Sequence, residues 1–454
     1  MGTASQVSAR RRIWGWWFFD WASQPYNTLL LTFVFGPYFQ QVATAHFATQ
    51  GLAPEAASAA AQAYWGWGQS ITGILIAVLA PLLGAFADGA GRRMPWIWGF
   101  SGLYVLGSFM LWFLIPSSPD LLMAQIWFGL GLIGMEFATI FTNALMPDLC
   151  DDEEMGKVSG YGFAFGYLGG ILALVVMLLF LAENGATGKT LIGLDPLFGL
   201  DATAREGTRS VGPFTALWFV VFMAPFFLWV REVPRVATGA GRALQSLMTL
   251  IRSLPQRPSL FAHLGSSMIY RDALNALYAF GGVYAAGVLG WSITQIGVFG
   301  IAGALAAAVF SWIGGRADSA RGPKPVMVVS IWVLIAVCLV IAGMTPESFY
   351  GVALAPGMAD KIFYACGMLI GAAGGTLQSS SRTMMVFHTT PQHATEGFGL
   401  YALSGKVTSF IAPAAVALAT TISGSQRMGI AIPLILLFLL GMVLLGWVKP
   451  KGER

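Results

Sequence analysis

Residues 84–93 read GAFADGAGRR, and residues 314–324 read GGRADSARGPK. Each stretch follows a long apolar segment and continues into basic residues. A second pair of short matches, GYG at 160–162 and GFG at 397–399, occurs in the same order along the chain. The repeated order predicts two structurally similar halves that follow one another in the sequence.

The composition is that of a chain that lies in lipid. Of its 454 residues, 56% are hydrophobic and only 10% are charged, and the mean hydropathy is +0.69. Soluble domains carry roughly 25% charged residues. A surface that faces a bilayer needs few charges, so the composition indicates an integral membrane protein. The net charge of +4 is too small to suggest a nucleic-acid partner.

Apolar segments long enough to cross a bilayer, which takes about 20 residues, fall into two groups of six. They lie near 14–42, 64–86, 95–115, 121–146, 158–182 and 212–230, and then near 260–288, 293–315, 325–344, 361–387, 396–421 and 427–448. We therefore predict an all-α membrane protein with 12 transmembrane helices in two pseudo-symmetric six-helix bundles. The bundles are residues 1–230 and 259–454, joined by a polar, basic cytoplasmic linker, 231–258, with a short surface helix around 241–252.

The orientation follows from the basic residues. If the N-terminus is cytoplasmic and the loops alternate, most of the 25 Lys and Arg residues fall in cytoplasmic loops, as the positive-inside rule requires. Both termini are then cytoplasmic. We expect no cleavable leader, because the first apolar run is long and contains Asp20. The high Ala and Gly content and the short loops favour a bacterial inner membrane.

Several stretches resemble the major facilitator superfamily, and more narrowly the branch of the vacuolar, autophagy-linked amino-acid effluxers and their bacterial relatives. They are FFDWASQPYNT (18–28), PLLGAFADGAGRRMP (81–95), SGYGFAFGYLGG (159–170), YRDALNALY (270–278) and SSSRTMMVFHTTPQHATEGFGLYALSGKVTSFIAP (379–413). The resemblance implies export of small solutes, with amino acids proposed for the fungal members. It does not carry a substrate over to bacterial members.

The repeated loop is a candidate gate, with Asp88, Arg92 and Arg93 in the first copy and Arg316 and Asp318 in the second. In the superfamily that it resembles, such a loop holds the halves together in the outward-facing state. Physically, Asp88 can pair with a cation or with a helix N-terminus. The alternative is a loop that serves only membrane topology.

Charges inside the apolar segments point to a solute site. They are Asp20, Glu136, Arg271, Asp272, Arg382 and Lys406. Each costs roughly 2.5–3.5 kcal/mol or more at the bilayer centre, so such residues face a cavity and pair or bind something. The first half holds only acids and the second holds all three cations. We predict a polarised cavity for a zwitterion, with its amine toward Glu136 and Asp20 and its carboxylate toward the cations. Alternatively, the charges pair with one another as gates, or the cations bind a purely anionic solute.

Glu136 is also the candidate proton carrier, because it lies mid-helix without a charged neighbour in sequence and burial favours its protonated form. Asp20 is a second candidate, although its shallow depth also suits a cytoplasmic gate. Glu136 could instead make a structural hydrogen bond. Neutral contacts to a solute are expected from Tyr26, Asn27 and Gln378, for which helix packing is the alternative.

The sequence therefore predicts a secondary active transporter for a small polar or zwitterionic solute of the amino-acid or short-peptide class, coupled to protons and working by efflux or exchange. The alternatives are a cation-coupled sugar symporter, an amphiphile or lipid translocator, and a non-transporting receptor or assembly factor. No phosphate-binding loop or catalytic motif indicates an enzyme or an ATP-driven pump. We expect no cofactor and no metal, since the three cysteines show no ligand spacing, and a monomer.

Overall fold

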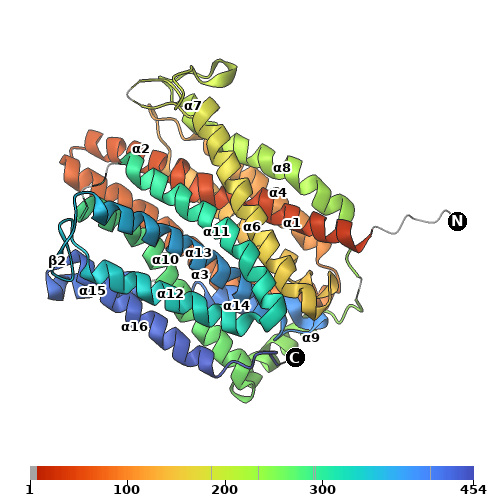
Figure 1. The fold of residues 1–454 in the computed structure, drawn as a ribbon. Coiled ribbons are helices and arrows are strands. Elements are labelled where there is room, and N and C mark those ends of the chain that lie inside the picture. Colours follow the sequence, from red (N-terminus) through yellow and green to blue (C-terminus); the bar gives the residue numbers. More distant parts are fainter. Residues whose placement is uncertain are drawn as a thin grey trace. The chain divides into compact units, whose positions relative to one another are not determined.

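The computed structural model in Figure 1 describes residues 8–185, 187–233, 235–289, 291, 293–408 and 411–453, and it is almost entirely helical. Before the linker the elements are α1 (Ala9–Pro25), the π-helix η1 (Tyr26–Phe33), α2 (Phe35–Thr49), α3 (Pro54–Ala90), α4 (Met94–Met110), η2 (Leu111–Phe113), α5 (Leu121–Asn143), η3 (Met146–Asp148), α6 (Asp152–Val176), η4 (Met177–Leu181), η5 (Leu197–Gly199), α7 (Glu206–Arg209) and α8 (Val211–Trp229).

The remaining elements begin with the linker helix. They are α9 (Ala240–Ser253), η6 (Leu254–Gln256), α10 (Pro258–Gly287), α11 (Ile293–Arg321), α12 (Pro323–Gly343), the antiparallel strands β1 (Ser348–Phe349) and β2 (Val352–Ala353), α13 (Met358–Val386), η7 (Pro391–His393), α14 (Ala394–Ser404), α15 (Ile411–Ser423) and α16 (Gln426–Gly446). The surface helix predicted around 241–252 is confirmed as α9.

Among the described residues, eight helices are long and apolar enough to cross a membrane. The other four predicted segments are interrupted or more polar. Segment 14–42 is broken by η1, and 396–421 was expected to be one helix but is divided into α14 and α15. Segments 260–288 and 361–387 correspond to the polar-residue-bearing α10 and α13. The chain is a multi-pass membrane protein, and the total of twelve spans stays a prediction.

The described residues form two compact units. Unit 1 comprises Met1–Val78, Arg92–Thr142 and Leu168–Val233, and unit 2 comprises Leu79–Gly91, Asn143–Tyr167 and Pro234–Arg454. Residues 1–7 and Arg454, which the two predicted bundles include, lie outside the described residues. Unit 2 thus combines the second half of the chain with the end of α3 and with the junction between α5 and α6. The division at 231–258 predicted from sequence stays a prediction.

Each unit has an apolar interior. In unit 1, α8 packs against α1 and α4, and the Trp16 indole donates a hydrogen bond to the carbonyl of Thr142 at 2.9 Å. In unit 2, α11 packs against α13, and α12 and α16 run side by side (Figure 1). The core of unit 2 is formed by apolar residues of α10, α12, α13 and α16, with Leu334, Phe363 and Phe438 fully buried. These helices hold the polar residues described next.

Candidate functional site

Asp88 lies near the end of α3 and caps α14 within unit 2. Its Oδ2 accepts hydrogen bonds from the backbone N–H groups of Thr395 and Glu396, both at 2.9 Å, and its Oδ1 accepts one from Thr395 Oγ1 at 2.7 Å. These donors belong to the first turn of α14, where backbone N–H groups lack helical partners and the helix dipole favours a negative charge. Asp88 therefore meets a helix N-terminus, one of the two partners that its sequence position suggested.

Glycines allow this close approach. A Cβ atom on Gly84 would lie 2.6 Å from the carbonyl oxygen of Thr395, and one on Gly399 would lie 2.6 Å from the carbonyl oxygen of Ala80. Real Cβ atoms do not come so near to backbone, so any larger residue would separate α3 from α14. The glycines thus set the distance at which the Asp88 carboxylate reaches the α14 backbone.

The second copy of the loop makes a different contact in unit 2. Asp318 in α11 is buried, and its Oδ1 accepts a hydrogen bond from Ser380 Oγ at 2.8 Å. Beside it the start of α6 packs on α11, since a Cβ atom on Gly160 would lie 2.6 Å from the Cα atom of Gly315. The Lys157 N–H donates to Ser319 Oγ at 3.1 Å. Each copy of the loop therefore lies beside a close helix contact that glycines allow, α3 with α14 in the first copy and α6 with α11 in the second.

The basic residues predicted for the gate divide between three environments. The Arg316 guanidinium lies 3.7 Å from the ring centroid of Trp312. Arg92 is exposed. Arg93 is buried, and its backbone N–H, like that of Met94, donates to the Glu232 carboxylate. The structure thus brings Arg316 to an aromatic surface in unit 2, whereas Arg93 belongs to a helix cap in unit 1.

Arg382 is held by the last residue of α5 and by the first half of α6. Its Nε donates to Ser159 Oγ at 3.0 Å, its Nη2 to the Ser159 carbonyl at 2.7 Å, and its Nη1 to Asn143 Oδ1 at 3.3 Å. Its guanidinium lies 4.3 Å from the ring centroid of Phe163. Arg382 was predicted to bind solute, but in this structure it is buried and ties α13 to residues 143–163.

Arg271 and Asp272, adjacent in α10, contact the two helix ends created where α14 and α15 separate. Arg271 Nη1 donates to the carbonyl of Tyr401 near the end of α14 at 3.1 Å, and its guanidinium lies 4.6 Å from the Tyr401 ring centroid. Asp272 Oδ2 accepts a hydrogen bond from the Ala412 N–H in the first turn of α15 at 2.8 Å. The cation thus meets a helix C-terminus and the anion a helix N-terminus, as the helix dipoles favour.

Two further predicted solute contacts lie near this break or on α13. Lys406 is half-buried just beyond the end of α14. Gln378 is half-buried in α13 and donates to the Gly374 carbonyl at 3.4 Å; it also contacts Tyr167. Together with Arg271 and Asp272, they give unit 2 several polar side chains around an interrupted helix.

The candidates in unit 1 are more dispersed. Tyr26 is fully buried, and its hydroxyl donates to the Phe128 carbonyl at 2.6 Å, so it packs helices and is not available to a solute in this structure. Asn27 is half-buried in the π-helical η1, and its carbonyl accepts a hydrogen bond from Thr32. Asp20 in α1 and Glu136 in α5 are both half-buried. π-Helical turns are frequent at functional sites, which keeps Asn27 among the candidates.

Sequence reasoning missed the partners of these charges. Asn143, Ser159 and Glu396 carry no signal of their own, because each is an ordinary polar residue whose role depends on a helix far away in sequence. The linker is also fastened: Arg235 Nη2 donates to both carboxylate oxygens of Asp148, at 2.9 and 2.8 Å. The acidic stretch that begins at Asp148 is the local signal for such a basic partner. Within the described part of the chain, no group of three or more His, Cys, Asp or Glu residues is positioned to hold a metal.

Solved structures show which class of protein this fold belongs to. The human organic anion transporter MFSD10 has a TM-score of 0.70 with 17% sequence identity, covering 97% of this chain and 100% of its own. The major facilitator superfamily transporter FucP, solved in its outward conformation, has a TM-score of 0.65 with 14% identity, covering 98% and 99%. The fold is that of a major facilitator superfamily transporter.

Sequence similarity narrows the class. The uncharacterized MFS-type transporter YxiO of Bacillus subtilis (strain 168) is 26% identical over 446 residues, which cover 96% of this chain and 94% of that protein. Residues 8–454 match the family described as vacuole effluxer Atg22 like. The chain belongs to the Atg22-like vacuole effluxer family, which confirms the resemblance seen in its sequence.

His393, just before α14, is a titratable group that faces a carboxylate. Its ring lies 2.9 Å from Glu396 Oε1, and the hydrogen bond to that carboxylate raises the pKa of His393 above its ordinary value. A group whose pKa is raised on folding stabilises the fold at pH values below its unfolded pKa, about 6.5 for histidine. That stabilisation is lost as the pH rises through the folded-state pKa.

We expect His393→Gln to lower the melting temperature of the purified protein more at about pH 6 than at about pH 8.5, on either side of the ordinary histidine pKa. The measurement is thermal unfolding of both proteins across this range. In a Glu396→Gln background the same histidine substitution should have an effect that no longer varies with pH. If the difference in melting temperature between the wild-type protein and His393→Gln did not change with pH, the assigned pair of His393 and Glu396 would be contradicted.

Proposed function

We propose that this transporter moves a small zwitterionic solute of the amino-acid or short-peptide class, by efflux or exchange coupled to protons, and that it works as a monomer in a bacterial cytoplasmic membrane. The observation that carries the proposal is the interruption between α14 and α15, flanked by Arg271 and Asp272 of α10. Interrupted membrane helices expose backbone groups and dipole ends, and transporters use them to bind charged solutes.

The charges of unit 2 suit the carboxylate of such a solute. Two cations lie at the interruption. Lys406 follows the end of α14 in the sequence, and Arg271 contacts the Tyr401 carbonyl near that end. Arg382 already has three hydrogen bonds to Ser159 and Asn143, so we remove it from the solute contacts and give it a role in holding α13 to α6. The amine is assigned to Glu136, with Asp20 as the alternative, because these are the two acids that the first half of the chain has in predicted membrane segments.

Proton coupling is also assigned to Glu136, because it is an acid within a predicted membrane segment. Glu136 is a half-buried acid in an apolar helix, and ionisable residues in membrane segments mark proton and solute pathways. Competition between a proton and the amine of the solute for one carboxylate would couple the two fluxes. Efflux as the direction is supported by the family description, vacuole effluxer.

The cap that Asp88 makes on α14 is assigned as the cytoplasmic gate. The cap, the Arg382 contacts and the glycine contacts of α6 with α11 all join unit 2 residues from the first half of the chain to residues from the second half. In alternating access, such contacts form when the cytoplasmic side closes and break when it opens. The gate and the interrupted helix meet in α14, which begins at the cap and ends at the break.

A thermal-shift experiment tests the solute assignment. Purified protein is heated with amino acids and short peptides, organic anions, sugars or lysolipids, one class at a time. A zwitterion at a hundred times its Kd should stabilise the protein by about 2.7 kcal/mol. Arg271→Gln and Lys406→Gln should each weaken its binding about tenfold, because each removes a charge-assisted hydrogen bond. Lys361→Gln, at an exposed position of α13, is the matched control and should bind like wild type.

Other outcomes replace the assignment. Stabilisation by anions that lack an amine would show that the site binds organic anions and not zwitterions. Stabilisation by sugars or lysolipids that ignores Arg271 and Lys406 would overturn the charged site altogether.

The gate is tested through Cys150, which follows η3. Burial raises the pKa of the Cys150 thiol to about 12, so maleimide should react with it slowly. We expect Asp88→Asn to speed this labelling about tenfold, because losing a charged acceptor costs about 1.5 kcal/mol. Peptide mass spectrometry separates Cys150 from the buried Cys338 and Cys366.

Asp120→Asn is the control for this experiment, since Asp120 Oδ1 caps the start of α5 by accepting the Met123 N–H at 2.9 Å. It removes the same kind of cap away from the proposed gate. Equal labelling rates in the two variants would show that Asp88 does not control access to this side of the protein.

A further inference from the structure

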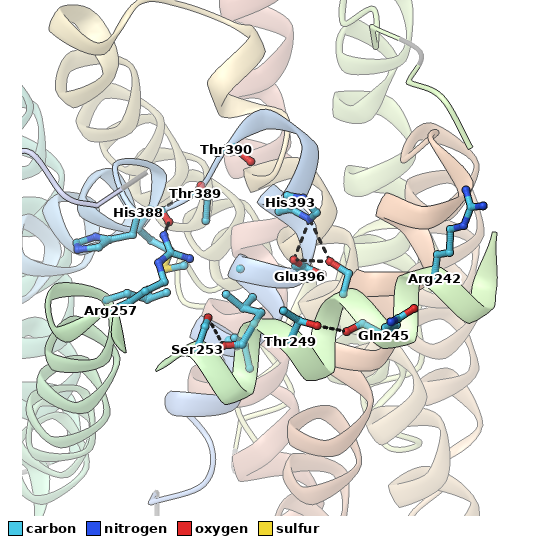
Figure 2. A pocket seen from close by; sticks show the side chains of 16 residues that line it. Arg242, Gln245, Thr249, Ser253, Arg257, His388, Thr389, Thr390, His393 and Glu396 are labelled. Carbon is cyan, nitrogen blue, oxygen red and sulfur yellow. Dashed lines mark hydrogen bonds and ion pairs between the residues drawn. The ribbon is translucent and has the colours of Figure 1, made fainter. Parts of the chain in front are cut away.

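A pocket of about 580 Å³ lies within unit 2, at the start of α14 and away from the break between α14 and α15. It is bounded by α9, by the end of α13, by η7 and by the first turns of α14, as Figure 2 shows. Its volume falls within the range of small-molecule sites, roughly 300–1,000 Å³. The transport function proposed above makes no use of it.

The linker helix α9 turns its polar face into this pocket. Arg242, Gln245, Ser246, Thr249 and Ser253 line it, and their spacing of three or four residues puts them on one side of the helix. The opposite side is apolar and exposed: Leu244, Met248 and Ile251 retain 41%, 49% and 40% of their accessible surface.

This orientation is the reverse of that of a helix in water. An exposed apolar stripe suits the boundary region of a bilayer, while Leu247, between the two faces, packs against Ala85 of α3. The pocket on the polar side would then lie at the depth of lipid head groups and remain open to the cytoplasm.

The charges that face the pocket sum to an excess of positive charge. Arg242 and Arg257 lie at its opposite ends, and His393 lies between them (Figure 2). The one carboxylate in the lining, Glu396, is buried and already paired with His393 at 2.9 Å. Arg257 Nη2 donates to the carbonyl oxygens of His388 and Glu453. Arg242 is exposed.

Hydroxyl groups also line the pocket. They belong to Ser246, Thr249, Ser253, Thr389 and Thr390. The hydroxyls of Thr249, Ser253 and Thr389 donate to nearby backbone carbonyls and that of Ser246 to Glu396, so these groups would turn toward a ligand on binding. Guanidinium groups bind phosphate through paired N–H groups, and hydroxyls donate to its remaining oxygens. Two cations at the two ends fit a ligand with two anionic groups better than a single small anion.

We propose that this pocket binds an extended ligand that carries two phosphate groups, either a soluble diphosphate or the head group of a lipid with two phosphates. The ligand would touch α9 and the start of α14 at once. Since the Glu396 N–H donates to Asp88 at 2.9 Å, an occupied pocket would stabilise the turn that Asp88 caps. The site is thus regulatory and distinct from the solute site, and it stands or falls independently of the transported solute.

Binding is tested on the full-length protein in neutral detergent. Calorimetric titration with ADP and with inorganic pyrophosphate tests the soluble source. Native mass spectrometry with cardiolipin, against phosphatidylcholine, tests the lipid source. Saturable binding in either arm supports the pocket and identifies the source; competition between pyrophosphate and cardiolipin shows that one site takes both.

The variants locate the site. Arg242→Gln should weaken binding about tenfold, the loss of one charge-assisted contact. Arg252→Gln removes another exposed arginine of the same helix, one that does not line the pocket, and it should change affinity by less than about twofold, as expected for a surface charge. No binding in either arm, or equal weakening by both variants, would overturn the proposal. Because neither assay measures transport, its failure is separable from failure of the transport proposal.

Discussion

The contact of the Asp88 carboxylate with the first turn of α14 is the interaction on which this end of unit 2 depends. It satisfies two backbone N–H groups and one hydroxyl with a single side chain, in a chain where few charged residues are available to do so. A helix that begins near a membrane surface has N–H groups that need an acceptor. A negative charge at that position also meets the favourable end of the helix dipole. The cap therefore holds the start of α14 through several hydrogen bonds. Because a single side chain makes all of them, moving that side chain breaks the cap.

The other end of α14 obeys the same electrostatics. Arg271 contacts a carbonyl near its C-terminus, and Asp272 contacts an N–H at the start of α15. One helix is thus held by an anion at its beginning and a cation near its end, and the next helix begins at an anion. A solute carboxylate that draws on Arg271 would compete with the Tyr401 carbonyl and loosen the end of α14. That competition is a physical route by which binding at the interruption could reach the Asp88 cap.

Much of this could be predicted from the sequence where the signal is local. The loop around Asp88, its copy around Asp318 and the amphipathic linker helix all have residue patterns that depend only on neighbours in the chain. The division of segment 396–421 could not be predicted, because its residues are compatible with one helix and the interruption is stabilised by side chains from α10. The hydrogen-bond partners of Arg382 could not be predicted for the same reason, because Ser159 and Asn143 lie more than two hundred residues away in the sequence.

The predicted solute contacts show a related limit. Tyr26 stands in a sequence rich in polar and aromatic residues, but its hydroxyl is used by the Phe128 carbonyl within the core of unit 1. A sequence shows which side chains can form hydrogen bonds, but it does not show which of them already bond to a neighbouring helix. Pairing of the cations with helix ends and carbonyl groups likewise becomes visible only in three dimensions.

The central claim is that the Asp88 cap controls the closure of this side of the protein. Electron–electron double resonance between spin labels at the exposed positions Ala90 and Gln392 measures the separation of α3 from the turn before α14. We predict one short distance in the otherwise wild-type protein and an added, longer population when Asp88 is replaced by Asn. A distance distribution unchanged by that replacement would contradict the account.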